Sequence, residues 1–277
     1  MNGRTKRVLL VDNGSLEPAG TLQLRRIGAA LEARTGVGVE PVSLAHSDRI
    51  AAECLDGQSA ELFGAGLERV LNEGATEIMV APLFVGPSHA ITRWLPALIE
   101  ERVKGRDSVS VKVTAPLWIA KEKRLAEMLA EDVRAAVAGG ATGARVAVVD
   151  HGSPAREVTA ARDAVAAQLR ELLGDAVANV AACSMERREG AEFDFNEPLL
   201  ERLLARAEWR RGPLVVALLF VAPGRHAGPG GDVERIVRAA RGDDWHNVRF
   251  TRVLGEHPRL VEILADRVRD AGEVGGR

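Results

Sequence analysis

The sequence predicts an α/β protein built from two tandem, similar domains, each a doubly wound parallel sheet. Short and almost continuous apolar runs alternate with amphipathic helical patterns, which is typical of parallel strands covered on both faces. The whole pattern also occurs twice within the 277 residues. At a usual domain size of about 150 residues, the length agrees with two domains or with one large α/β unit, and the repeat favours two.

The repeat is visible in three apolar segments. The copies are Val8–Ser15 with Val146–Ser153, Met79–His89 with Val215–His226, and Val111–Leu117 with Val248–Leu254. A stretch of small residues at 138–144 separates the two copies and has too few side chains to pack as an element. We therefore expect a first domain over residues 1–138 and a second domain over residues 144–277.

The elements follow the same order in both copies. In the first copy we expect strands at 7–12, 38–44, 77–84 and 109–115, with helices at 18–34, 59–73, 92–103 and 121–137. In the second copy we expect strands at 145–150, 177–184, 213–221 and 247–253, with helices at 157–173, 195–208, 231–240 and 258–270. A parallel sheet then forms in each half.

Composition excludes several classes of protein. The 37 Lys and Arg residues nearly balance the 39 Asp and Glu residues, so no basic field favours nucleic acid or an anionic membrane. The two cysteines cannot form a disulfide framework or a thiolate metal site. The first apolar run, Val8–Val11, is too short for a signal peptide, and no apolar run approaches the length of a membrane span. We expect a cytoplasmic protein.

Nucleotide and hydrolase motifs are missing as well. The sequence contains no P-loop, no GxGxxG after a strand and no GxSxG elbow. A histidine phosphatase would need an arginine directly before His151, where Asp150 instead would repel phosphate. No nucleotide cofactor is expected.

Polar residues after the strands of the second half point to a metal-handling site. His151 follows the first strand of this half, Glu186 follows the second, and His226 follows the third. Because βα loops of a parallel sheet meet at its carboxyl edge, these side chains should converge. Two neutral imidazoles and a carboxylate suit a divalent transition metal. The alternative is structural: a histidine after a strand often only orders its loop, and Glu186 can belong to a solvated charged loop.

At this point the residues carry a family resemblance. The strand that ends in Asp150-His151-Gly152-Ser153, together with the later segment Leu219–Asp232, resembles the ATP-independent class II chelatases. The chain is most similar to their two-halved sirohydrochlorin cobalt- and ferrochelatases, over roughly residues 7 to 270. The resemblance implies a lyase-class enzyme that inserts cobalt or iron, with nickel also possible as substrate, into sirohydrochlorin or a related tetrapyrrole for cobalamin or sirohaem synthesis.

Carried over residue by residue, the resemblance implies that His151 and His226 hold the metal and that Glu186 joins them in catalysis. The first half departs from this pattern, because Asn13 stands in the place of His151, and only His89 of the pair remains. His46 follows the second strand of that half, near the place of Glu186, and is equally well explained as a loop residue. The resemblance also implies a cleft between the two domains, which the histidines face. We expect one working site, in the second half, with the first half as a lid or a wall for the tetrapyrrole.

A tetrapyrrole with several carboxylates needs cations at the rim of its site. The expected substrate-binding residues are Ser153, Arg187, Arg188, Gly224, Arg225 and His89. A second interpretation stays open, in which the protein is a non-catalytic carrier of a tetrapyrrole or metal ion on the same fold. The chain is expected to work as a monomer or homodimer.

Overall fold

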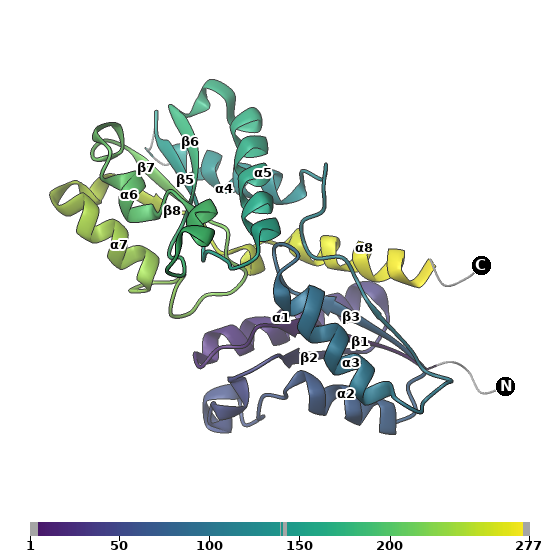
Figure 1. Cartoon of the computed structure of the whole chain (residues 1–277). Coiled ribbons are helices and arrows are strands. Elements are labelled where there is room, and N and C mark those ends of the chain that lie inside the picture. Colours follow the sequence, from purple (N-terminus) through teal and green to yellow (C-terminus); the bar gives the residue numbers. More distant parts are fainter. Residues whose placement is uncertain (1–4, 139, 141–142, 274–277) are drawn as a thin grey trace. The chain divides into compact units, whose positions relative to one another are not determined.

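The computed structural model describes residues 5–138, 140 and 143–273. Eight strands form two four-stranded parallel sheets within this part of the chain, with strand orders β2-β1-β3-β4 and β6-β5-β7-β8 (Figure 1). The strands are β1 (Lys6–Asp12), β2 (Val39–Ser43), β3 (Glu77–Pro82), β4 (Ser110–Val113), β5 (Arg145–Asp150), β6 (Asn179–Ser184), β7 (Leu214–Leu218) and β8 (Val248–Phe250). The predicted fold class and every predicted strand are confirmed.

All eight predicted helices form. They are α1 (Pro18–Thr35), α2 (Phe63–Asn72), α3 (Leu95–Val103), α4 (Arg124–Ala138), α5 (Arg156–Leu173), α6 (Leu200–Leu204), α7 (Asp232–Arg241) and α8 (Leu260–Glu273). The helix α1 shows how local sequence sets the bounds. It begins at Pro18, whose fixed φ suits the first turn, and it ends at Gly36, which adopts the left-handed conformation at φ +70°.

Both faces of each sheet are covered by helices. In β1, Leu9 and Val11 join a buried cluster with side chains of α2 and α3, while Val8 and Leu10 are buried on the opposite face. In the other sheet, Val149 of β5 belongs to a cluster with side chains of α6 and α7. Each fully buried Val or Leu contributes about 1.5–3 kcal/mol to folding. This two-sided burial explains why the strands read as continuous apolar runs.

The chain divides into two compact units that differ from the two sequence repeats. One unit comprises residues 1–117 and 258–277, and the other comprises residues 118–257. Helix α4 of the first repeat packs on α5 and β7, whereas α8 of the second repeat packs on α1 and β3. The repeats have therefore exchanged their last helices. We call residues 118–257 the second unit and the remainder the first unit.

The expected ranges 1–138 and 144–277 describe sequence repeats, and the compact units cut the chain elsewhere. The difference arises because α4 and α8, which occupy equivalent places in the two repeats, each pack on the strands of the other repeat. Of the expected separating stretch, residues 139, 141 and 142 lie outside the described residues. The cleft expected between the domains stays a prediction. No helix in the described part of the chain is long and apolar enough to cross a membrane.

Candidate metal-handling site of the second unit

The carboxyl edge of the second sheet brings the three predicted site residues together. The strands β6, β5 and β7 are neighbours in this sheet. His151 lies in the loop after β5, Glu186 in the loop after β6 and His226 in the loop after β7. The centroids of the two imidazole rings are 4.7 Å apart, and their planes meet at 79°. Nε2 of His151 lies 3.5 Å from Oε1 of Glu186. These three side chains, drawn from three separate loops, therefore share one site.

The site is open to solvent. The side chains of His151, Glu186 and His226 are 47%, 61% and 35% exposed. Imidazole nitrogens can bind a divalent metal, and the carboxylate can accept a proton. In the described part of the chain, no group of three or more His, Cys, Asp or Glu side chains is already arranged as a metal cage.

A glycine sets the close approach of the first two loops. Gly152 has φ +93°, and a Cβ atom there would lie 1.9 Å from the carbonyl oxygen of Glu186. The backbone N–H of Glu186 donates a hydrogen bond to the carbonyl of His151 at 3.1 Å. Only glycine allows this conformation and this contact at once. The loop backbones thus place the His151 and Glu186 side chains side by side.

A carboxylate that sequence reasoning did not assign orients the second histidine. Nδ1 of His226 lies 2.6 Å from Oδ2 of Asp232, the first residue of α7. Burial acts to raise the pKa of Asp232, but the bond from His226 and the Arg235 guanidinium outweigh it and hold that pKa below its ordinary value. Asp232 is therefore ionised at neutral pH. The signal in the sequence was an aspartate six residues after the histidine, at a helix start that follows two glycines.

A network of buried polar side chains holds the His151 loop in place. Arg162 of α5 is only 1% exposed and donates to Ser184 Oγ at 2.5 Å and to the Asn196 carbonyl at 2.9 Å. Its guanidinium is 3.8 Å from Asp150. Burial raises the pKa of Asp150 above its ordinary value, although the charge of Arg162 acts against the rise. The Asn196 side chain holds both the N–H and the carbonyl of Ser153. No sequence pattern indicates this network, since Arg162 lies within an ordinary helical pattern.

The residues expected to bind substrate fall into different groups. The Arg187 guanidinium is engaged by Asp194 and Glu197 and by two backbone carbonyls, so it anchors its own loop. Arg188 lies over the Phe193 ring at 6.0 Å. Arg225 is exposed beside the site, 3.8 Å from Asp232.

Of the other three expected residues, Ser153 and Gly224 make hydrogen bonds that shape their own loops, and His89 lies in the other unit. Ser153 caps the turn into α5, accepting the N–H of Ala155 at its hydroxyl. Gly224 donates its N–H to the carbonyl of Ala227, which closes the His226 loop. His89 lies in the first unit, after β3. The substrate-binding roles of all six residues stay predictions.

The first unit has an incomplete version of the site. Asn13 takes the place of His151, and a Cβ on Gly14 would lie 1.7 Å from the carbonyl oxygen of Ala45. This contact matches that of Gly152 with Glu186, so Ala45 takes the place of Glu186. His46, expected near this place, is the next residue and precedes a short helical turn at φ +69°.

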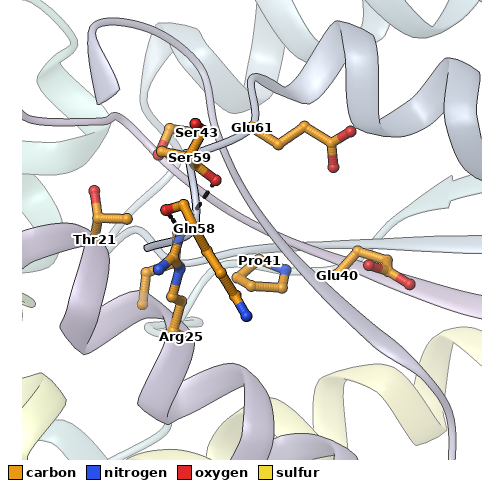
Figure 2. Close-up of a pocket in the computed structure, with 10 residues that line it drawn as sticks. Thr21, Arg25, Glu40, Pro41, Ser43, Gln58, Ser59 and Glu61 are labelled. Carbon is orange, nitrogen blue, oxygen red and sulfur yellow. Dashed lines mark hydrogen bonds between the residues drawn. The ribbon is translucent and has the colours of Figure 1, made fainter. Parts of the chain in front are cut away.

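The support network of the first unit lacks the arginine. Helices α1 and α5 correspond residue for residue, so Leu24 stands in the place of Arg162. A cavity of about 150 Å³ lies there, and Figure 2 shows Thr21, Ser43, Ser59 and other residues around it. The Thr21 hydroxyl is buried with no hydrogen-bond partner within the described residues. Burial raises the pKa of Asp12 to about 6, although hydrogen bonds from Ser43 and Gly14 act against the rise.

The family of the chain is shown by a match over nearly its whole length. The family model of CbiX matches residues 7–136 and again residues 145–271. The chain belongs to the CbiX family. The resemblance to two-halved sirohydrochlorin chelatases is confirmed, and this CbiX-family chain contains the family unit twice, as the internal repeat predicts.

Solved structures of similar fold cover the CbiX-family chain from end to end. SirB from Bacillus subtilis with Fe³⁺ has a TM-score of 0.74 at 18% identity, over 99% of this chain and 98% of that one. The sirohydrochlorin chelatase SirB of Bacillus subtilis subspecies spizizenii, in complex with cobalt, has a TM-score of 0.71 at 18% identity, over the same shares. CbiX, described as the terminal enzyme of sirohaem biosynthesis in denitrifying bacteria, has a TM-score of 0.58 at 20% identity, over 97% of this chain and 99% of that one. A comparison with curated proteins finds no match.

Proposed function

We propose that this protein is an ATP-independent chelatase that inserts a divalent metal, cobalt or iron, into sirohydrochlorin or a related tetrapyrrole. The observation that carries the proposal is the pair His151 and His226, with ring centroids 4.7 Å apart and Glu186 beside them, in the second repeat of a CbiX-family chain. The SirB structures with Fe³⁺ and with cobalt support the same metals.

The chemistry requires a site that holds the metal loosely and accepts protons. A divalent metal that enters the macrocycle replaces two pyrrole N–H protons. Two positive charges therefore enter with the metal and two leave as protons. His151 and His226 offer the metal a few bonds that it can exchange for the pyrrole nitrogens. Glu186, exposed and 3.5 Å from His151, receives a released proton and passes it to solvent. No nucleotide is needed, because forming the metal–nitrogen bonds drives the reaction.

We assign the carboxylates of the substrate to cationic side chains at the rim of the site. Arg225 is exposed next to the histidines, and Arg188 projects from the Glu186 loop, so we assign both to the acidic side chains of the tetrapyrrole. Arg187 contributes through the shape of its loop, since two carboxylates already engage it. Ser153 is assigned to the substrate through its hydroxyl, which accepts the Ala155 N–H and has its own proton to donate, and Gly224 is assigned to close approach of the flat macrocycle.

The first repeat is proposed as a wall for the macrocycle. Asn13 and Ala45 remove two of the three reactive side chains, and only His89 remains. Leu16 and Trp94, which follow β1 and β3, are exposed large apolar side chains that suit the flat face of a tetrapyrrole. We expect His89→Ala and Trp94→Ala to raise the KM for the tetrapyrrole more than they lower kcat.

The test is anaerobic absorbance of sirohydrochlorin with Co²⁺ at substoichiometric enzyme. Wild type should complete many turnovers, whereas His151→Ala and His226→Ala should fall to the uncatalysed rate. His246→Ala is the matched control, because His246 is an exposed histidine of the same unit outside the site. If wild type shifts the tetrapyrrole spectrum by binding but never exceeds the rate without enzyme, with Co²⁺, Fe²⁺ and Ni²⁺ alike, the carrier interpretation replaces the chelatase. Cytoplasmic location and a monomeric or homodimeric state remain part of the proposal.

A further inference from the structure

We propose that Asp232 is a positioning residue for metal transfer, which holds His226 as the tautomer whose Nε2 lone pair faces the metal. The inference rests on the proposed function, in that His226 is taken as a metal ligand. It adds a residue to which sequence reasoning gave no role.

The geometry of the pair decides the tautomer. The Nδ1 of His226 and Oδ2 of Asp232 are 2.6 Å apart, a short distance that indicates a charge-assisted hydrogen bond. A carboxylate can only accept a hydrogen bond, so the proton lies on Nδ1. The neutral ring then carries its lone pair on Nε2. A histidine that binds a metal through one nitrogen is typically fixed by such an acceptor on the other.

Backbone hydrogen bonds hold the loop that carries His226 against the start of α7. The N–H groups of Asp232 and Val233 donate to the carbonyls of Arg225 and His226, at 3.0 and 3.1 Å. The histidine and its carboxylate are therefore tied by backbone as well as by side chain. A Cβ on Gly231 would lie within 3.0 Å of three carbonyl oxygens, so the chain folds tightly here. Little freedom remains for the His226 ring except rotation, which the Asp232 bond prevents.

The first repeat supplies an internal comparison. His89 corresponds to His226, and α3 begins at Leu95 in the position where α7 begins at Asp232. A helical turn at Ala90–Trp94 leads directly into α3, so the helical segment of the first unit starts before Leu95, and it starts without a carboxylate. Its histidine has no carboxylate partner in the part of the chain that the structure describes. The carboxylate accompanies the histidine pair, and the fold alone does not require it.

A structural explanation of Asp232 is also testable. An acidic residue in the first turn stabilises a helix, and Arg235 pairs with Asp232 in that turn. Glu234 offers a matched control, since it lies on the same helix, pairs with Arg238 and accepts the Gly230 N–H at 2.7 Å. It holds the same loop but does not touch His226.

The experiment measures Co²⁺ binding by calorimetry to the metal-free protein, without tetrapyrrole, for wild type, Asp232→Asn and Glu234→Gln. Asparagine keeps the size of the side chain but can bond either tautomer. We expect Asp232→Asn to weaken Co²⁺ binding about 10- to 100-fold and Glu234→Gln to change it less than about twofold. Nitrogen-15 spectra of the histidines should show protonated Nδ1 at His226 in wild type and a mixture of tautomers in Asp232→Asn. Asp232→Glu should restore part of the affinity.

The outcomes separate this inference from the proposed function. If Asp232→Asn binds Co²⁺ as wild type does, or if Glu234→Gln weakens binding equally, the positioning role is refuted. If wild type inserts no metal into sirohydrochlorin while Asp232→Asn still loses Co²⁺ affinity and the single tautomer, the positioning role stands and the chelatase proposal fails. In an active enzyme, Asp232→Asn should lower kcat and leave the KM for the tetrapyrrole unchanged.

Discussion

Replacing Asp12 with asparagine removes a carboxylate whose ionised form is disfavoured by burial in the first unit. Burial raises the pKa of Asp12 from 3.8 to about 6. Each pH unit of difference between the folded and unfolded pKa corresponds to about 1.4 kcal/mol, so the ionised carboxylate costs the first unit about 3 kcal/mol. Asparagine retains an oxygen for the Gly14 N–H, which Asp12 accepts at 3.0 Å. Asp12→Asn should therefore stabilise the first unit at pH 7–8.

The sign of the pH dependence follows from the same shift. Between pH 3.8 and about 6 the folded state of Asp12 binds more protons than the unfolded state, so stability falls as pH rises through this window and is constant above it. Asp12→Asn should remove this fall and equal wild type in stability at low pH. The opposite slope, or an unchanged slope in the variant, would refute burial as the cause.

The assay must report on one unit at a time, because a two-unit chain need not unfold in one step. Hydrogen exchange of the β1 amides, corrected for the intrinsic rate at each pH, gives the free energy of opening of the first unit. The β5 amides of the second unit serve as the internal control and should not change. Equal gains in β1 and β5 would contradict the local explanation.

Three further predictions concern backbone, core and thiols. Gly152→Ala should destabilise the second unit by at least about 3 kcal/mol in hydrogen exchange of β5, because φ +93° and a contact of 1.9 Å oppose the added methyl. Gly36→Ala, with open space around it, should destabilise the first unit by only about 1 kcal/mol in hydrogen exchange of β1. Arg162→Met should destabilise the second unit by about 3–5 kcal/mol in urea, since it leaves a buried carboxylate without its cation; a loss under 1 kcal/mol would contradict this. A thiol reagent should label one cysteine in the native protein, the exposed Cys54, because Cys183 is buried and burial raises its thiol pKa; two fast labels would show that the core is open.

Much of the fold was predictable because strands buried on both faces have a strong signature. The bounds differ where local bonds end an element early. Strand β7 ends at Leu218 instead of 221, since the carbonyls of Phe220 and Val221 accept the N–H groups of Leu254 and Gly255 in the next loop. Helix α6 begins at Leu200 instead of 195, since Pro198 disfavours helix in the residue before it.

The site was only partly predictable from the sequence. His151, His226 and Glu186 follow strands, and topology alone brings such residues to one edge. Arg162 and Asp232 escaped prediction, because an amphipathic pattern does not reveal which charged side chain points inward or which carboxylate meets a ring. The exchange of α4 and α8 was not predicted either, since the pattern of a repeat does not show which of two similar sheets its last helix packs on.

That exchange fixes an order of assembly during synthesis. The second unit is continuous and complete once residue 257 has left the ribosome, whereas the first unit waits for residues 258–277. At about 5–20 residues per second, the early part of the first unit waits roughly 10–30 s for α8. During that time the face of β3 that contains Met79 and Ala81 lacks the helix that covers it. The half that begins first is thus finished last, and the half with the histidine pair matures without waiting for it.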